Sequence, residues 1–280
     1  MANLVDLLAA VDDRPASECG AFVVDGGHGA MLGSVFVETG RVCWAAAAGR
    51  SGRLRDLLHR HSARPLDEVE LDAVFEDCRG AHRPLCEVLL ERGLVSDDGL
   101  REALKQHTVE SLIAQCDGSD RPAVWVPHRQ RGYRARHTFS PIELLAAAGA
   151  LLYPAELASA DLGLLAELPA QTAGSFAIDD EDQPVAVWTT GTRAWRVRAL
   201  LELGDWAAAA LGVCNGFSSA AMQRAVATVT GSAALGWRSA RRLVHAAVID
   251  EPAALAQLVA ELADRRLPAV LSSRVPAGHP

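Results

Sequence analysis

The stretch Gly33-Ser-Val-Phe-Val-Glu-Thr-Gly-Arg-Val-Cys-Trp-Ala45 decides the fold of the first half of the chain. It holds two short runs of β-branched and aromatic residues, separated by the glycine-bearing turn Thr39-Gly40. A third run, Gly20-Ala-Phe-Val-Val-Asp25, precedes it across the turn-rich segment Gly26-Gly-His-Gly29. Because glycine supplies the positive φ that tight hairpin turns require, this pattern predicts a meander of antiparallel strands.

Helical periodicity replaces the strand pattern after Ser51. Apolar residues recur at helical spacing in several segments, at 54–58, 66–75, 85–94, 96–113 and from 140 onward. Gly93 is placed to end the third of these helices, and Ser96 is placed to cap the next. Ser140-Pro-Ile-Glu143 is a capping box with proline at the first helical position, which predicts a helix start.

The second half follows a boundary predicted at Tyr153-Pro154. Its elements come in the order helix, two strands, helix, three strands and helix, at 155–168, 174–180, 184–190, 197–211, 225–230, 233–238, 243–249 and after Asp250-Glu-Pro252. The sequence therefore predicts an α+β protein with domains at 1–152 and 153–268 and a frayed tail at 269–280. We expect a strand meander with helices in the first domain, and a five-stranded antiparallel sheet flanked by helices in the second.

Composition narrows the class of protein. The chain has 280 residues, of which 50% are hydrophobic and 22% charged, so it can bury a core and is not disordered. The formal net charge of −8 argues against a protein that coats nucleic acid or anionic membrane through its overall field. The N-terminus lacks a signal-peptide pattern, and the apolar run 144–153 is too short for a membrane span. We therefore expect a cytoplasmic protein without membrane insertion.

Motifs for catalysis, cofactors and metals are weak. The loop at 26–33 has no lysine and leads into a strand, so it is a hairpin connection and not a nucleotide site. The spacing Cys78-x3-His82-x3-Cys86 is the most metal-like, but glycine and proline interrupt it and no fourth ligand lies nearby. Six cysteines at irregular spacing without a C-x-x-C pair indicate reduced structural thiols. We expect no cofactor, no bound metal and no enzymatic activity.

The segment from His128 to His137 is a local basic run. Residues 123–126 and 133–139 predict a hairpin around Arg131-Gly132, so the run would lie at its tip. Arginines beside an aromatic ring suit an acidic protein partner, or stacking on nucleic acid. Two tryptophans near arginines in the second domain are further candidates for contact. The candidate partner-contact residues are Arg129, Arg131, Tyr133, Arg134, Arg136, Trp195 and Trp206.

Four segments of the first half share the pattern of one bacterial family. They are Leu4-Val-Asp-Leu-Leu8, Cys19-Gly-Ala-Phe22, the stretch 33–45 and Leu85-Cys-Glu-Val-Leu-Leu-Glu-Arg-Gly-Leu-Val-Ser96. On these segments, residues 1–150 resemble the PatA-type N-terminal domain, a bacterial domain of poorly defined function in regulatory proteins. The resemblance implies a role in signalling.

The second half carries a different pattern. Its residues are Leu165-Ala-Glu-Leu-Pro169, Gly174-Ser-Phe-Ala-Ile-Asp179, Pro184-Val-Ala-Val187 and Val248-Ile-Asp-Glu-Pro252. With the order of elements, they make residues 154–266 similar to a Roadblock/dynein light chain module, a fold related to profilin. The resemblance implies a homodimer and a Ras-like small GTPase as partner.

These observations favour a non-catalytic bacterial signalling adaptor that acts by protein–protein contact, with a small GTPase as one partner. The alternative is a nucleic-acid or transcription-associated factor that uses the basic run 128–137, which the acidic net charge disfavours.

Overall fold

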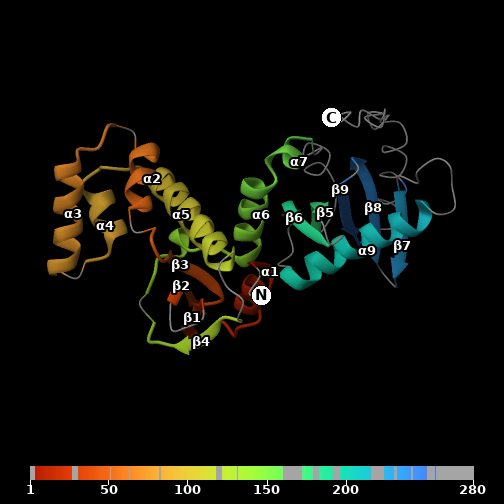
Figure 1. Ribbon diagram of the computed structural model, residues 1–280, viewed down its shortest axis with the longest axis horizontal. Coiled ribbons are helices and arrows are strands. Elements are labelled where there is room, and N and C mark those ends of the chain that lie inside the picture. Colours follow the sequence, from red (N-terminus) through yellow and green to blue (C-terminus); the bar gives the residue numbers. More distant parts are fainter. Residues whose placement is uncertain are drawn as a thin grey trace, which may run out of the picture. The chain divides into compact units, whose positions relative to one another are not determined.

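The computed structural model describes residues 4–26, 31–50, 52–62, 64–81, 83–117, 122–130, 132–159, 172–178, 183–191, 196–215, 224–229, 232–240, 242–250 and 256. Helices and antiparallel sheets alternate along it, so the α+β class is confirmed (Figure 1). The chain divides into two compact units, unit 1 at residues 1–144 and unit 2 at 145–280. The division falls inside helix α6 (Pro141–Leu152), earlier than the boundary predicted at 152/153.

Unit 1 contains a four-stranded antiparallel sheet in the order β3-β2-β1-β4. The predicted meander is confirmed as β1 (Cys19–Asp25), β2 (Met31–Glu38) and β3 (Arg41–Ala47). Thr39 and Gly40 make the second turn with φ values of 53° and 69°. The left-handed backbone at both positions matches a hairpin turn of the primed type.

The predicted hairpin of 123–126 with 133–139 is wrong. Strand β4 (Val124–Pro127) pairs with β1 at the opposite edge from β3, and Trp125 packs on Phe22 with ring centroids 4.9 Å apart. Residues 133–139 instead run through the short 3-10 helix η1 (Ala135–His137), and Phe139 bridges to Val42 of β3. Strand β4 therefore pairs with the free edge of β1, where Trp125 can pack on Phe22, and not with the segment that follows it in the sequence.

Besides η1 and the first turn of α6, the described part of unit 1 contains five α-helices. They are α1 (Leu4–Asp12), α2 (Arg53–His61), α3 (Glu68–Ala81), α4 (Leu85–Glu91) and α5 (Asp97–Asp117). Gly93 follows α4 with a φ of 61°, and Ser96 Oγ accepts the Gly99 N–H at 3.0 Å, so both predicted caps are confirmed.

Helix α5 packs against β3 and β2 and against α2. Arg53 of α2 donates from Nε and Nη2 to the two carboxylate oxygens of Glu110 on α5, at 2.6 and 2.7 Å. This bidentate pair fixes the angle between the two helices because both donors of one planar group are used.

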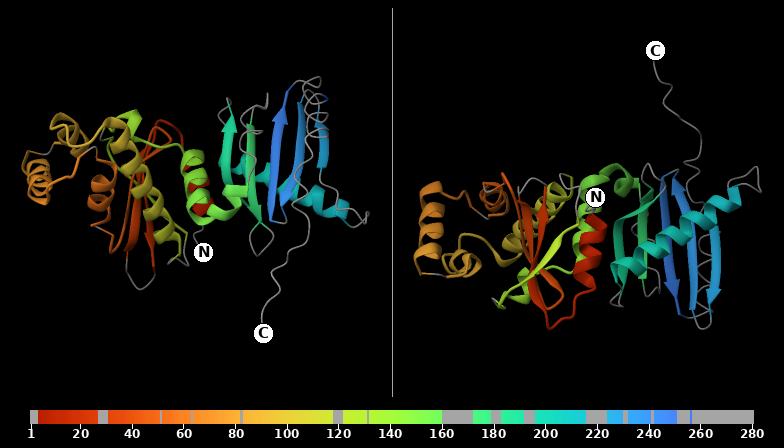
Figure 2. Two further views of the ribbon diagram at one scale, coloured as in Figure 1. Left: turned by 90° about the horizontal axis from the view of Figure 1, so that it is seen from above. Right: turned by 60° about the horizontal axis from the view of Figure 1, so that its bottom comes forward.

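Unit 2 contains a five-stranded antiparallel sheet in the order β6-β5-β9-β8-β7. Its elements are the second half of α6, α7 (Pro154–Ser159), β5 (Thr172–Ile178), β6 (Pro184–Gly191), α9 (Val197–Asn215), β7 (Arg224–Val229), β8 (Ser232–Ala240) and β9 (Leu243–Ile249). Figure 2 shows α9 running obliquely across one face of this sheet. Tyr153 and Leu157 pack on a cluster of Ala177, Val187 and Leu243.

The centre of this sheet holds a buried polar pair. The Ser175 hydroxyl and His245 Nδ1 lie 2.8 Å apart on neighbouring strands, and Trp237 stacks on the His245 ring at 5.2 Å. All three side chains are fully buried. A polar pair satisfied across two strands fixes their register, since a slip by one residue would leave both groups without partners.

Three predictions lie largely outside the described residues, namely the helix at 155–168 beyond Ser159, most of the last helix and the tail at 269–280. Among the helices that are described, none is long and apolar enough to cross a bilayer.

The approach of α5 to β2 generates a prediction about Gly33. A Cβ at this position would lie well inside van der Waals contact with the Ala46 carbonyl oxygen and with Cδ of Gln115. We expect Gly33→Ala to lower the free energy of unfolding by about 1–3 kcal/mol because the backbone or α5 must shift. Urea denaturation followed by tryptophan fluorescence measures the change.

Gly80 is the matched control, because it is exposed in α3 and a Cβ there meets nothing within 4 Å. Gly80→Ala should raise stability by about 0.5–1 kcal/mol through helix propensity. Equal effects of the two substitutions would contradict the close packing of α5 on the sheet.

Candidate functional site

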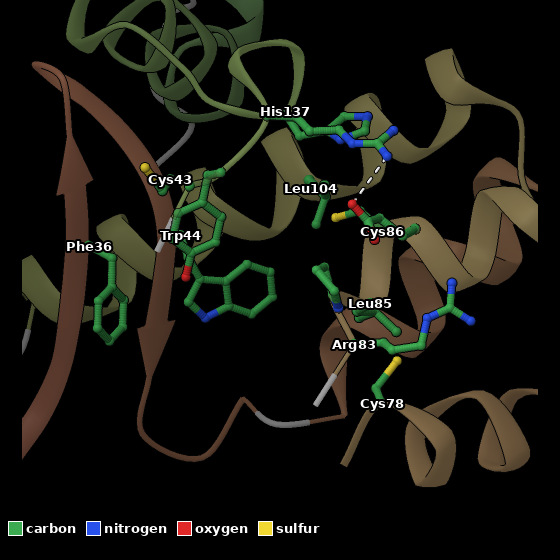
Figure 3. A pocket seen from close by; sticks show the side chains of 14 residues that line it. Phe36, Cys43, Trp44, Cys78, Arg83, Leu85, Cys86, Leu104 and His137 are labelled. Atoms are coloured by element: carbon green, nitrogen blue, oxygen red, sulfur yellow. Dashed lines mark hydrogen bonds and ion pairs between the residues drawn. The ribbon is translucent and has the colours of Figure 1, made fainter. Parts of the chain in front are cut away.

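Unit 1 encloses a pocket of about 600 Å³ (Figure 3). Strands β2 and β3 and helix α5 form one side, and the α3–α4 connection forms another. The loop of residues 132–137, which belongs to the predicted basic run, forms the remaining wall. Four segments far apart in the sequence therefore meet at this site.

The inner part of the pocket is apolar. Phe36 and Trp44 are cross-strand neighbours on β2 and β3, and Leu104 of α5 is almost fully buried beside the cavity. Trp44 is held by His107, whose ring lies 4.5 Å from it at 30°. Leu85, at the start of α4, completes this lining.

The loop wall is tied to the sheet by Glu38. This carboxylate, at the end of β2, is only 3% exposed. Its Oε2 accepts the backbone N–H groups of Gly132 at 3.1 Å and Tyr133 at 3.4 Å. A buried carboxylate that accepts two backbone N–H groups holds the loop in one conformation, because releasing it would strand a buried charge.

His137 is the most constrained polar group of the pocket. It is 4% exposed, and its Nε2 lies 3.0 Å from Asp97 Oδ1 at the start of α5. Burial, followed by the charges of Arg134, Arg136 and Arg101, lowers the pKa of His137, so the imidazole is neutral near pH 7. A carboxylate has no proton to donate, so Nε2 carries the hydrogen and Nδ1 carries a lone pair. Nδ1 has no hydrogen-bond partner among the described residues.

Further bonds hold the loop beyond His137. Arg101 of α5 forms an ion pair with Glu143 and lies 4.9 Å from the centroid of the Phe139 ring. Arg41 of β3 donates to the Thr138 hydroxyl and carbonyl oxygens, both at 2.7 Å. The segment that presents His137 is therefore rigid at both ends.

Paired charges line the remaining wall. Arg134 Nη2 lies 3.1 Å from Glu87 Oε1, and both residues line the pocket. Arg83 also lines the pocket and bonds Glu91 at 2.5 Å. In Figure 3 the Arg83 guanidinium points away from Trp44 and Leu104.

Three cysteines line the same cavity, namely Cys43, Cys78 and Cys86. Burial is the main cause that raises all three pKa values, that of Cys43 to about 12. The thiols are therefore protonated at neutral pH and are poor nucleophiles.

The metal-like spacing of the sequence is split by the fold. Cys78 lies in α3, which continues through Gly80 instead of breaking there, and Cys86 lies in α4. His82 lies outside the described residues. Within the part of the chain that the structure describes, no three His, Cys, Asp or Glu side chains come together as a metal site would need.

The structure separates the predicted contact residues. Tyr133 and Arg134 line the pocket, whereas Arg136 forms ion pairs with Asp97 and, at 2.5 Å, with Asp98. Arg129 is exposed after β4.

The remaining predicted partner-contact residues are not part of this pocket. Trp206 is half-buried on α9 of unit 2, where its ring approaches Gly236 of β8. Arg131 and Trp195 lie outside the described residues.

Sequence reasoning missed several residues of the site, notably Glu38, Trp44, Glu87, Asp97 and Leu104. The position of Glu38 could have been informative. A carboxylate at the end of an apolar strand needs a hydrogen-bond partner if that end of the strand is buried. The others gave no such signal, because their roles depend on contacts with distant segments.

Comparisons with known proteins identify no family for this chain. No family model and no curated protein sequence matches the chain. Two solved structures of MglB resemble it at 16% sequence identity and a TM-score of 0.30. One shows MglB in a tetrameric arrangement, and the other is the gliding protein MglB from Thermus thermophilus. The similarity covers 41% of this chain and 86% and 87% of those chains. A TM-score of this size carries no argument about fold or function.

His107 and His137, the histidines that are buried in the described part of unit 1, predict the direction of its pH dependence. Burial is the first cause that lowers the pKa of both His107 and His137 from the usual 6.5. The unfolded chain therefore binds more protons than the folded chain below pH 6.5, and stability falls as the pH falls through that range. Urea midpoints at pH 7.5 and 5.5 measure the slope.

His107→Gln should make this pH dependence shallower, because one buried titrating ring is removed. A wild-type protein that becomes more stable on acidification would contradict the burial of neutral histidines.

Proposed function

We propose that this protein is a non-catalytic signalling adaptor of bacterial type, cytoplasmic, that acts by binding other proteins. In this proposal unit 2 is a Roadblock-like module that forms a homodimer and binds a Ras-like small GTPase. Unit 1 is a PatA-type domain that recruits a second partner.

The arrangement of unit 2 carries the proposal. A β5–β6 hairpin, the helix α9 and the meander β7–β8–β9 follow one another, and β9 pairs with β5. This places the two hairpins side by side in one antiparallel sheet with α9 on one face. The order agrees with the Roadblock-like pattern of the sequence, and fold-level likeness of this kind supports an interaction role without naming the residues involved.

The open edge of the sheet supports a homodimer. Strand β7 pairs with β8 on one side and has no partner strand on its other side among the described residues. An edge strand presents unpaired N–H and C=O groups, and a second copy of the same strand satisfies them.

The described thiols and imidazole of the unit 1 pocket are not arranged as a nucleophile and its base. Its pocket thiols are protonated, and its only deeply buried imidazole along the cavity wall, His137, is held by Asp97 without a neighbouring nucleophile hydrogen-bonded to it in the described chain. Covalent catalysis needs an activated nucleophile beside its base.

The ion pairs of the basic run favour protein contact over nucleic acid. Arg134 and Arg136 already bind Glu87, Asp97 and Asp98. Each would have to leave a carboxylate to reach a phosphate, so the gain from counterion release would be reduced.

The first test is the mass of the purified chain by light scattering. A homodimer has twice the 29.7 kDa of one chain, and dilution should shift the measured mass toward the monomer. A mass equal to one chain at every concentration would contradict the homodimer.

The second test is capture of partners from the native cell lysate with the tagged full chain, in GDP and in a non-hydrolysable GTP analogue. We expect a P-loop GTPase to be enriched in one nucleotide state. Trp206→Ala should reduce that enrichment several-fold, because a half-buried tryptophan next to exposed surface is typical of contact anchors.

Trp125→Ala, at a half-buried tryptophan of unit 1, is the matched control and should leave GTPase capture unchanged. Partners that are enriched equally with both nucleotides would contradict the proposal that a GTPase is the partner. They would still agree with the proposal that the protein is an adaptor. An eluate without specific partners would contradict the adaptor itself.

A further inference from the structure

We propose that the pocket of unit 1 binds an uncharged small molecule with one or two fused aromatic rings. The proposal concerns unit 1 alone, and it does not depend on unit 2 or on the identity of any protein partner.

The middle of the pocket presents apolar side chains that the chain leaves incompletely covered. Phe36, Trp44 and Leu85 line the cavity and are partly exposed, although residues of these types are usually buried. Trp44, Leu85 and Leu104 approach the same space from β3, the start of α4 and α5 (Figure 3). A ligand that removes these surfaces from water gains free energy in proportion to the apolar area that it covers.

The charged side chains of the lining already have partners. Arg134 binds Glu87 at 3.1 Å, and both residues line the pocket. Arg83 binds Glu91 at 2.5 Å, and its guanidinium points away from Trp44 (Figure 3). A ligand charge that is buried beside Trp44 would lose its hydration without gaining a free counter-charge, and this costs free energy.

The histidine and the cysteines of the lining add no charge. Burial is the first cause that lowers the pKa of His137 and raises the pKa values of the cysteine thiols, so these side chains are neutral at pH 7. The lining therefore favours an uncharged ligand over an anion or a cation.

Contacts within the chain hold the walls of the pocket in place. Glu38 Oε2 accepts the N–H groups of Gly132 and Tyr133 at 3.1 and 3.4 Å, and the His107 ring packs on Trp44 with centroids 4.5 Å apart. A pocket whose walls are fixed by the fold needs little ordering when a ligand enters, so less of the free energy gained by burial is lost.

The lining favours a flat ring over an aliphatic body. Three aromatic side chains line the pocket, those of Phe36, Trp44 and Tyr133. Pairs of aromatic rings gain from offset-stacked and edge-to-face contacts beyond the burial of their area. The volume of about 600 Å³ falls within the range of roughly 300–1,000 Å³ that is usual for small-molecule sites, and it admits fused rings.

The first probe is indole, titrated calorimetrically into the full chain at neutral pH. Indole-3-acetate adds a carboxylate to the same ring, and tryptamine adds an ammonium group. We expect indole to bind with a Kd below about 1 mM, and each charged compound to bind about tenfold more weakly, because its charge would be buried without a partner. No binding of indole up to about 5 mM, or equal affinity for either charged compound, would overturn the proposal.

Phenol and cyclohexanol test the preference for an aromatic ring. Both are neutral at pH 7, and both carry one hydroxyl on a six-membered ring. Phenol should bind about threefold more tightly or better, because only its ring gains contacts with the aromatic side chains. Equal affinity for the two compounds would contradict the aromatic class of the ligand.

Two variants place the binding in this pocket. Leu85→Trp should weaken indole at least about tenfold, because the larger side chain occupies the cavity. Tyr133→Ala should weaken indole about threefold through the loss of one ring contact. Tyr133 is 36% exposed, so its variant tests the proposal even where the Leu85 variant fails to fold. Wild-type affinity in both variants would overturn the assignment to this pocket.

Leu151→Trp is the matched control, because it makes the same substitution at a leucine of α6 that is 48% exposed and does not line the pocket. It should leave the affinity for indole at the wild-type value. An equal loss from Leu85→Trp and Leu151→Trp would show that the effect does not arise in the cavity, and would overturn the assignment.

Discussion

The carboxylate of Asp97 joins the first turn of α5 to the loop that closes the pocket. It accepts from His137 and forms an ion pair with Arg136 of the same loop. Both partners lie some forty residues further along the chain, so this side chain, together with Glu38 of β2, places the basic run against the pocket. Asp97 fixes His137, while Glu38 holds Tyr133 and Glu87 holds Arg134 on the pocket wall.

Helix α5 can play this part because the sheet and α2 hold it firmly. Its middle lies close to β2 at Gly33, and Glu110 is bound by both ends of the Arg53 guanidinium. The same helix presents Leu104 to the cavity and His107 to Trp44. A single rigid helix therefore supplies the apolar wall, the support of the aromatic wall and the anchor of the loop. This explains how a pocket can form from segments that share no sequence motif.

The sequence predicted what depends on neighbours along the chain. The meander of β1 to β3, the cap at Ser96, the stop at Gly93 and the helix start at Ser140 all follow from turn and capping chemistry within a few residues. The pairing of β4 with β1 did not follow, since the contact of Trp125 with Phe22 links positions that no local rule connects.

The candidate site was foreseen only in part, and for the same reason. Tyr133 and Arg134 were selected for their charge and ring, and they do line the pocket. Cys78 and Cys86 were noticed for their spacing, but the fold brings them to a cavity as protonated thiols and not as half of a metal site. The roles of Glu38 and Asp97 depend on their burial and partners in the fold, and neither can be predicted from the presence of a charged residue in the sequence.

The most direct test of this account is the tautomer of His137, read from long-range proton–nitrogen correlations of the full chain with nitrogen-15 in its histidines. A His137→Gln spectrum assigns the signals. The account predicts a neutral ring at pH 7 with the hydrogen on Nε2 and a bare Nδ1, because Asp97 accepts from Nε2. Hydrogen on Nδ1 with a bare Nε2 would contradict the anchor at Asp97, and a doubly protonated ring at that pH would contradict the lowered pKa of the buried imidazole.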